Sequence, residues 1–319
     1  MGTRRPCDGR ARAGPGPAPH AGDRRQPRAA RPVLADPPGR AHPQRPPGWR
    51  AEPAAAAAAP PARVAPPAQA GRAALHGFGP FASEGKIPVT VVLLPGLAGD
   101  TEMWRDQLTG LAKHRPVVSD THTRHASIPE MAAAMLARFT GPLALCGASM
   151  GGMVAMEAAR QAPDRVRGLA LLGTSARPEN EEMRAVREKA IELFAQGRAR
   201  EVIEPNVALA FDADPDPALA IRYLDFVLRA GASQLVRQNR AVIARPDARK
   251  HLGQVRCPTL VMCGEGDQLT PPELSREIAS LVPGAELVML PRCGHMLTME
   301  QPAAVNRELE RWLARVEKA

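Results

Sequence analysis

The strongest constraint on the fold of this chain is a set of short apolar runs, each closed by turn-forming residues. Their side chains do not alternate between apolar and polar types. Unbroken runs of this kind are typical of strands buried on both faces, as in a parallel sheet covered by helices. The runs occupy residues 88–96, 115–120, 142–147, 167–173, 258–264 and 285–291. We therefore expect about six parallel strands.

The stretches between these runs carry the periodicity of amphipathic helices. In the final stretch, one helical stripe holds Val305, Leu309, Trp312, Leu313 and Val316. Thr270 is followed by two prolines and Glu273, which predicts a helix that begins here with Thr270 as its cap. Strands that alternate with helices predict a doubly wound α/β sheet with right-handed crossovers.

One long segment breaks this alternation. Residues 177–250 have helix-like sequence without a strand-like run, and the turn-rich residues 212–217 divide them. An insertion of this length between two strands predicts a helical cap after the fourth strand. We accordingly expect an α/β core formed by residues 87–176 and 251–319, with residues 177–250 as its cap.

Residues 1–86 differ in composition from the rest of the chain. They hold 14 of the 42 Lys and Arg residues, 5 of the 33 Asp and Glu residues and 17 of the 34 prolines, which leaves 28 basic and 28 acidic residues for the remainder. The net charge of +9 therefore belongs to this tail and gives no reason to expect nucleic-acid binding. A segment with so little apolar content is expected to be disordered. Two interpretations stay open: a basic linker that touches anionic surfaces, or upstream sequence included by a start site placed too early.

We expect no export signal, because the tail lacks the apolar core of roughly 7 to 15 residues that a signal peptide needs. No run is apolar enough to span a membrane, so we expect a cytoplasmic protein.

The five cysteines lack the spacing of a zinc site. Asp120, His122 and His125 also fit no metal motif, and we expect them in a solvated loop beside the mouth of the active site that the sequence predicts. No phosphate loop or dinucleotide fingerprint is present, so we expect neither a metal nor a cofactor.

Ser149 lies in Gly147-Ala148-Ser149-Met150-Gly151, between a predicted strand and a predicted helix. This is the context of a nucleophile elbow, whose tight turn requires small residues two before and two after the nucleophile. The alternative is a small residue in an ordinary turn. We predict that Ser149 is a nucleophile.

Asp267 and His295 follow the last two predicted strands, at the carboxyl edge where open α/β sheets build their sites. The order serine, acid, histidine predicts that His295 accepts the proton of Ser149 and that Asp267 orients the imidazole ring. Glu265 is the rival for the acid role, and Asp267 would otherwise be a turn or helix-capping residue.

A glycine-rich loop, Leu94-Pro95-Gly96-Leu97-Ala98-Gly99-Asp100, ends the first predicted strand. Such a loop can aim a backbone N–H at the oxyanion of a tetrahedral intermediate. The N–H groups of Leu97 and Met150 are the predicted pair of donors.

Several motifs agree in order and spacing with a known family. LLPGLAGDTEMW, GASMGG, APDRVRGLALLGTSARP, CPTLVMCGEGDQLTPP and PRCGHMLTMEQP resemble enzymes of the α/β-hydrolase fold, which include carboxylesterases, enol-lactonases and C–C hydrolases. The resemblance implies Ser149 as nucleophile, Asp267 as acid, His295 as base, and Leu97 and Met150 as oxyanion donors. Two features depart from the family. The glycine-rich loop has PG where many relatives have HG. The two strands that open the family's sheet have no counterpart in this chain unless residues 73–86 add an edge.

These observations predict a serine hydrolase that cleaves a carboxylic ester or lactone of a small molecule through an acyl-enzyme. An enol-lactonase or a C–C bond hydrolase of an aromatic-degradation pathway is the alternative within hydrolases. A non-catalytic binding protein of the same fold is the alternative of another class. Residues 221–250 hold seven basic and two acidic side chains, which favours an anionic acyl group or lactone. The oligomeric state is not predicted.

Overall fold

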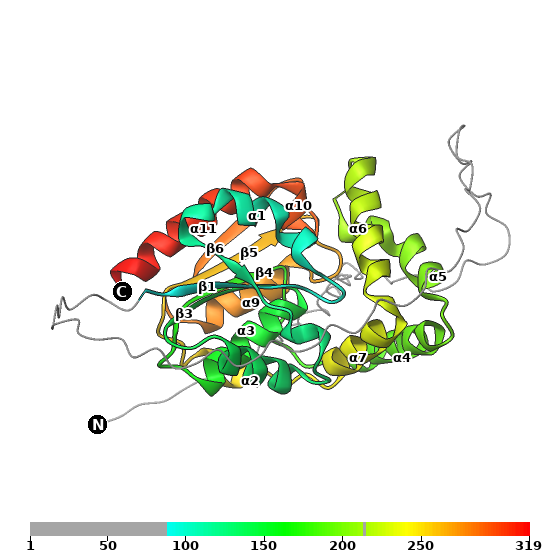
Figure 1. Ribbon diagram of the computed structural model, residues 1–319, viewed down its shortest axis with the longest axis horizontal. Helices are drawn as coiled ribbons and strands as arrows, with labels where there is room; N and C mark the ends of the chain where they lie inside the picture. Colours follow the sequence, from blue (N-terminus) through cyan, green and yellow to red (C-terminus); the bar gives the residue numbers. More distant parts are fainter. Residues whose placement is uncertain (1–87, 213–214) are drawn as a thin grey trace, which may run out of the picture. The chain divides into compact units, whose positions relative to one another are not determined.

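The computed structural model describes residues 88–212 and 215–319 (Figure 1). The expected disorder of residues 1–86 and the edge that residues 73–86 were left open to add both lie outside the described residues.

The core is one six-stranded, all-parallel sheet, in the order β2-β1-β3-β4-β5-β6. The prediction of about six parallel strands is confirmed, because each predicted apolar run overlaps one of them. The strands are β1 Thr90–Leu94, β2 Val117–Val118, β3 Leu143–Ala148, β4 Val166–Leu172, β5 Thr259–Gly264 and β6 Glu286–Leu290. The chain crosses from β2 at one edge to β3 on the other side of β1, so the sheet reverses its winding between β1 and β3. Ligands of open α/β sheets bind at the carboxyl ends of the strands at this switch point.

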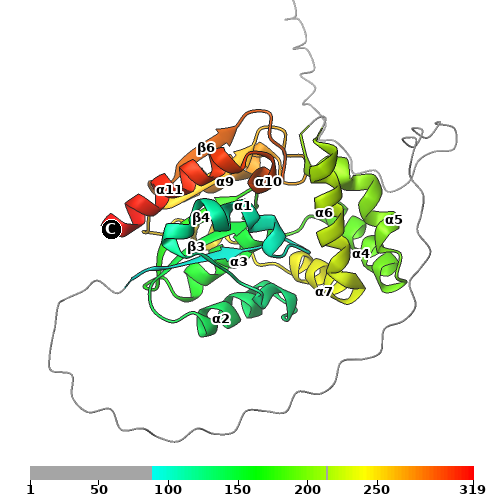
Figure 2. The same ribbon diagram turned by 45° about the horizontal axis from the view of Figure 1, so that its top comes forward.

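Both faces of the sheet are buried, which explains why the strands do not alternate. Leu93 and Cys146 belong to one apolar cluster, whereas Val92 and Leu145 belong to the other, and all four are 0% exposed. Helices α1 (Arg105–Gly110) and α11 (Pro302–Lys318) cover the first face. Helices α2 (Ile128–Arg138), α3 (Met150–Gln161) and α9 (Pro272–Leu281) cover the second (Figures 1 and 2).

The C-terminal helix α11 has the predicted apolar stripe. Val305, Leu309, Trp312, Leu313 and Val316 are all buried in the first cluster. The indole N–H of Trp312 also donates to the carbonyl of Pro258 over 3.0 Å, so its polar atom has a partner within the core. This helix therefore anchors the end of the chain to the sheet.

Between β4 and β5, the described residues form helices and loops without a strand. The helices are α4 Glu181–Ala195, α5 Ala199–Ile203, η4 Glu204–Ala210, α6 Pro217–Arg229, α7 Gly231–Ile243 and α8 Arg249–Leu252. We call the part from α4 to α7 the helical segment, and it follows the fourth strand as predicted. Figures 1 and 2 show α4 to α7 grouped beyond the end of the sheet to which β1 and β3 run.

The remaining helices are short and lie in the loops that follow strands. They are η1 Thr101–Trp104, η2 Ala112–His114, η3 Thr121–Thr123 and α10 Leu297–Glu300. Throughout residues 88–212 and 215–319, no helix combines the length and apolarity needed to cross a bilayer.

Candidate active site

Ser149 lies on the sharp turn that joins β3 to α3. Its φ is +53°, a region that residues other than glycine rarely adopt. Its N–H donates to the carbonyl of Leu172 over 2.9 Å, which ties the turn to the end of β4. Ser149 is partly exposed, whereas Ala148 and Met150 on either side are buried. A backbone of this kind costs roughly 1 to 3 kcal/mol and persists only where its surroundings hold it.

The glycines around Ser149 allow the backbone segments to approach one another. A Cβ atom on Gly147 would overlap with the carbonyl of Gly151, and one on Gly151 would overlap with the carbonyl of Leu94 at the end of β1. A Cβ atom on Gly152 would lie 2.7 Å from the Thr174 hydroxyl oxygen. The small residues of the motif are therefore required by the turn itself and by its contacts with β1 and the loop after β4.

Asp267 and His295 form a buried pair at the ends of β5 and β6. Their side chains are in contact through His295 Nδ1, which donates to Asp267 Oδ2 over 2.9 Å. The residues are 3% and 7% exposed. The rival carboxylate, Glu265, is exposed. Because Nδ1 is bound to the carboxylate, the ring is oriented and Nε2 is the nitrogen that remains for other partners.

The pair shifts the pKa values of both side chains. Burial alone would lower the pKa of His295, but the charge of Asp267 and its hydrogen bond to the ring outweigh burial and hold this pKa above its ordinary value of 6.5. Burial alone would raise the pKa of Asp267. The charge of His295 and the hydrogen bonds from His295 and Thr270 hold this pKa below its ordinary value of 3.8. Asp267 is therefore an anion at neutral pH, and it stabilises a positive charge on the ring.

The glycine-rich loop after β1 runs against Ser149. A Cβ atom on Gly96 would lie 3.2 Å from Ser149 Cβ. Leu97 follows Gly96 directly, and the Gly99 N–H closes a turn by donating to the Gly96 carbonyl over 3.0 Å. Met150 is the first residue of α3, and the first N–H groups of a helix have no carbonyl partner within it. The structure therefore places Leu97 in the turn whose Gly96 approaches Ser149, and Met150 directly after Ser149.

The loop after β4 joins the buried pair to Ser149. A Cβ atom on Gly173 would lie 3.2 Å from Asp267 Oδ2 and 3.4 Å from His295 Nδ1. The next residue, Thr174, donates its hydroxyl to the Ser149 carbonyl over 2.7 Å. All five predicted site residues thus gather at the carboxyl ends of the strands, beside the switch point between β1 and β3.

Comparison with known proteins identifies the family of this chain. A family model described as alpha/beta hydrolase fold matches residues 89–302. The chain belongs to the α/β-hydrolase fold family. The resemblance inferred from the motifs is confirmed.

Two solved structures of this family are similar along most of the chain. A thermophilic esterase from Thermogutta terrifontis is 27% identical, with a TM-score of 0.65 over 72% of this chain and 90% of that one. The enol-lactonase of Burkholderia xenovorans LB400 is 23% identical, with a TM-score of 0.65 over 73% of this chain and 93% of that one, and it supports the hydrolase fold alone.

A curated relative is the dihydrolipoyllysine-residue acetyltransferase component of the acetoin cleaving system of Pseudomonas putida. It is 29% identical over 249 residues, which cover 71% of this chain. The match spans 63% of that relative's own length.

One loop of this hydrolase-fold chain differs from the expectation. Among Asp120, His122 and His125, which were expected in a solvated loop, His122 is only 5% exposed. Its Nε2 lies 2.8 Å from the Gly99 carbonyl, because the loop folds against the glycine-rich turn. Asp120 forms an ion pair with Arg138 over 2.7 Å. The described part of the chain contains no cluster of three or more residues that could hold a metal ion.

Thr270 is a site residue that sequence reasoning missed, because it was interpreted as a helix cap. Helix α9 begins at Pro272, and its N-cap position is Pro271 without a side-chain cap bond. Two consecutive prolines lack N–H groups, so a capping hydroxyl would have little to satisfy there. The Thr270 hydroxyl instead donates to Asp267 Oδ2 over 2.8 Å, and its N–H donates to Asp267 Oδ1 over 2.8 Å.

Glu300 holds the loop that carries His295. Its carboxylate accepts the N–H of Gly294 over 3.0 Å and the N–H of Asp212 over 2.9 Å. The N–H of Met296 donates to the carbonyl of Ala210, at the end of η4, over 3.0 Å. Burial raises the pKa of Glu300 in spite of these donors. The histidine loop is therefore bound to the helical segment directly through the Met296 N–H, and through the Glu300 carboxylate on the Gly294 side.

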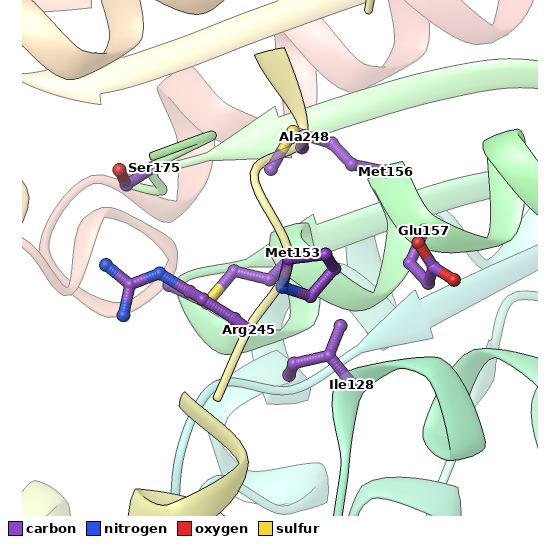
Figure 3. Close-up of a pocket in the computed structure, with 8 residues that line it drawn as sticks. Ile128, Met153, Met156, Glu157, Ser175, Arg245 and Ala248 are labelled. Atoms are coloured by element: carbon purple, nitrogen blue, oxygen red, sulfur yellow. The ribbon is translucent and has the colours of Figure 1, made fainter. Parts of the chain in front are cut away.

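A small cavity lies beside α3, away from the predicted site residues. Figure 3 shows it between α2, α3 and the stretch before α8, with the side chains of Met153 and Arg245 across it. Its lining residues are Ile128, Met153, Met156, Glu157, Ser175, Arg245, Pro246 and Ala248. Because Ser149, Asp267 and His295 do not line it, it is separate from the candidate active site.

Proposed function

We propose that this chain is a serine hydrolase that cleaves a carboxylic ester or lactone of a small molecule through an acyl-enzyme. The observation that carries the proposal is the bond of 2.9 Å between His295 Nδ1 and Asp267 Oδ2 beside a serine whose φ is +53°. A positive φ at a partly exposed serine presents its hydroxyl, and the adjacent histidine has its other ring nitrogen already bound.

In the first half of the reaction, Ser149 Oγ attacks the carbonyl carbon while His295 Nε2 takes its proton. Asp267 stabilises the imidazolium that forms. The N–H groups of Leu97 and Met150 stabilise the oxyanion of the tetrahedral intermediate. When this intermediate collapses, the C–O bond of the ester breaks and the leaving alkoxide takes the proton from His295. For a lactone, the alcohol stays attached to the acyl group.

In the second half, His295 removes a proton from water as the water attacks the acyl-enzyme. The second tetrahedral intermediate uses the same two N–H donors. Its collapse breaks the bond to Ser149 Oγ, which regains a proton from His295, and the carboxylic acid leaves. Because the same histidine acts as base and acid, its pKa sets the lower pH limit of turnover.

We further assign residues 177–250 as a cap over this site, on a core of residues 87–176 and 251–319. Two ion pairs join α6 to the loop after β1: Arg222 to Glu102 over 2.9 Å, and Arg229 to Asp100 over 2.9 Å. These ion pairs support the assignment, because they join the helical segment to the loop that carries the proposed oxyanion donor Leu97. The esterase of T. terrifontis, at 27% identity, supports ester hydrolysis as the reaction.

The test is the turnover of p-nitrophenyl acetate, of a panel of lactones and of vinylogous diketones by the full chain and its Ser149→Ala variant. We expect wild-type turnover of an ester or lactone, labelling by a fluorophosphonate probe, and loss of both in Ser149→Ala. Ser280→Ala is the matched control, because its hydroxyl bonds within α9 to the Glu277 carbonyl. Equal rates for wild type and Ser149→Ala would overturn the proposal, and turnover of diketones alone would establish the C–C hydrolase instead.

A further inference from the structure

We infer that Gln238, on α7 of the helical segment, is a positioning residue that holds the oxyanion loop. The inference rests on the proposed function. The Ala98 N–H donates to Gln238 Oε1 over 2.8 Å, and Gln238 Nε2 donates to the His122 carbonyl over 3.1 Å. Gln238 is 0% exposed, so its amide is satisfied by these two backbone groups without access to water. It joins the loop after β1 to the loop after β2, although it lies 140 residues beyond Ala98 in the sequence.

His122 completes the connection on the other side. Burial lowers the pKa of its imidazole, so the ring is neutral at neutral pH. A neutral ring has one N–H, and the Gly99 carbonyl 2.8 Å from Nε2 can only accept. The proton is therefore on Nε2, and the ring donates to Gly99 while the His122 carbonyl accepts from Gln238. Ala98 is thus held by Gln238, and the Gly99 carbonyl is held by His122.

The bond from the Ala98 N–H to Gln238 and the bond from His122 to the Gly99 carbonyl determine the direction of the Leu97 N–H. Peptide groups are planar, so the Gly96 carbonyl and the Leu97 N–H belong to one rigid unit. The Gly99 N–H donates to that carbonyl over 3.0 Å and fixes the unit. Gly99 is held by His122, and Ala98, whose φ is +60°, is held by Gln238. If the bond to Gln238 is lost, the loop is free to relax from its left-handed conformation, and the Leu97 N–H turns away from the oxyanion.

Gln238→Met tests this role, because it keeps the length of the side chain and removes both hydrogen bonds. Removing an oxyanion donor outright typically lowers kcat by about a hundred- to a thousandfold, and a displaced donor costs less. We expect kcat to fall about tenfold or more, with KM for the ester changed by less than about threefold. The affinity for a boronic acid, which forms a tetrahedral adduct with Ser149, should fall in parallel with kcat.

Asn239→Leu is the matched control. Asn239 is the next residue on α7, is also buried, and bonds to the Leu235 carbonyl over 2.9 Å and to Arg187 over 2.9 Å. This variant should lose thermal stability as Gln238→Met does, but keep kcat within about twofold, because its side chain has no bond to the oxyanion loop. A loss of kcat that is equal in the two variants would show a structural role only and would overturn the inference.

Gln238→Glu serves if Gln238→Met does not fold. Its carboxylate still accepts from Ala98, but it donates to the His122 carbonyl only when protonated. The ratio of its kcat to that of the wild type should therefore rise as the pH falls, and a constant ratio near one would contradict the inference. Failure of the proposed function is a different result, because the wild type itself would then show neither turnover nor fluorophosphonate labelling.

Discussion

The hydroxyl of Thr270 donates to Asp267 Oδ2 over 2.8 Å, within the same loop that presents Asp267 to His295. This bond and the bond from the backbone N–H of Thr270 hold the carboxylate in place. Because Thr270 is itself buried, nothing from water can replace the hydroxyl if it is removed. The bond therefore has a measurable consequence for catalysis and for stability.

Thr270→Val should weaken catalysis and stability together. It leaves a buried carboxylate with one fewer donor, which costs about 1 to 3 kcal/mol in the free energy of unfolding. The pKa of Asp267 should rise toward its ordinary value, and kcat should fall several-fold as the carboxylate loses its fixed position. Urea denaturation and steady-state kinetics on the same ester measure the two effects. Thr270→Ser retains the hydroxyl and should restore both, and wild-type kcat in Thr270→Val would show that the bond has no catalytic role.

The pH dependence of kcat/KM should reveal the raised pKa of His295. A general base works only when neutral, so activity is lost as the pH falls through this pKa, which lies above 6.5. Asp267→Asn removes the charge that raises it, so burial then lowers the pKa and the acid limb moves to lower pH. The rate of this variant should fall by up to about 10⁴-fold, since the asparagine amide can stabilise the wrong tautomer of the ring.

Glu265→Gln is the control for that pH profile. Glu265 lies two residues from Asp267 but is exposed. Its profile should superimpose on that of the wild type. An acid limb below pH 6.5 in the wild-type enzyme would contradict the raised pKa of His295.

Gly151→Ala should disrupt the turn at Ser149. Its added methyl group overlaps with the Leu94 carbonyl, so β1 and α3 must move apart. Overpacking of this kind typically costs about 1 to 3 kcal/mol, and more where the neighbour is rigid backbone. Differential scanning calorimetry and ester turnover measure the loss. Gly253→Ala, where the nearest atom is 3.9 Å away and φ is −63°, should leave both unchanged, and equal behaviour of the two variants would refute the packing argument.

The strands could be predicted because burial on both faces leaves a local signature, the unbroken apolar run. That Ser149, Asp267 and His295 gather at one edge of the sheet could be predicted, because each lies a few residues beyond such a run and parallel strands bring their carboxyl ends together. Thr270, Gln238 and His122 could not. The partners of Gln238 and His122 come from other segments, and no spacing along the chain records that approach. The sequence around His122 is polar and therefore predicts a solvent-exposed loop. In the structure, the ring of His122 is buried against the glycine-rich turn.

The helical segment shares hydrogen bonds with the loops on either side of Ser149. Gln238 holds the loop after β1, and the Ala210 carbonyl accepts from Met296 beside His295. Engineering by exchange of this segment between relatives is therefore not modular. A chimera that carries the helices of a relative would lose the hydrogen bonds that hold the candidate active site, together with the original specificity. To alter substrate range, the residues that face the substrate should be changed one at a time, with positions 210 and 238 left as they are.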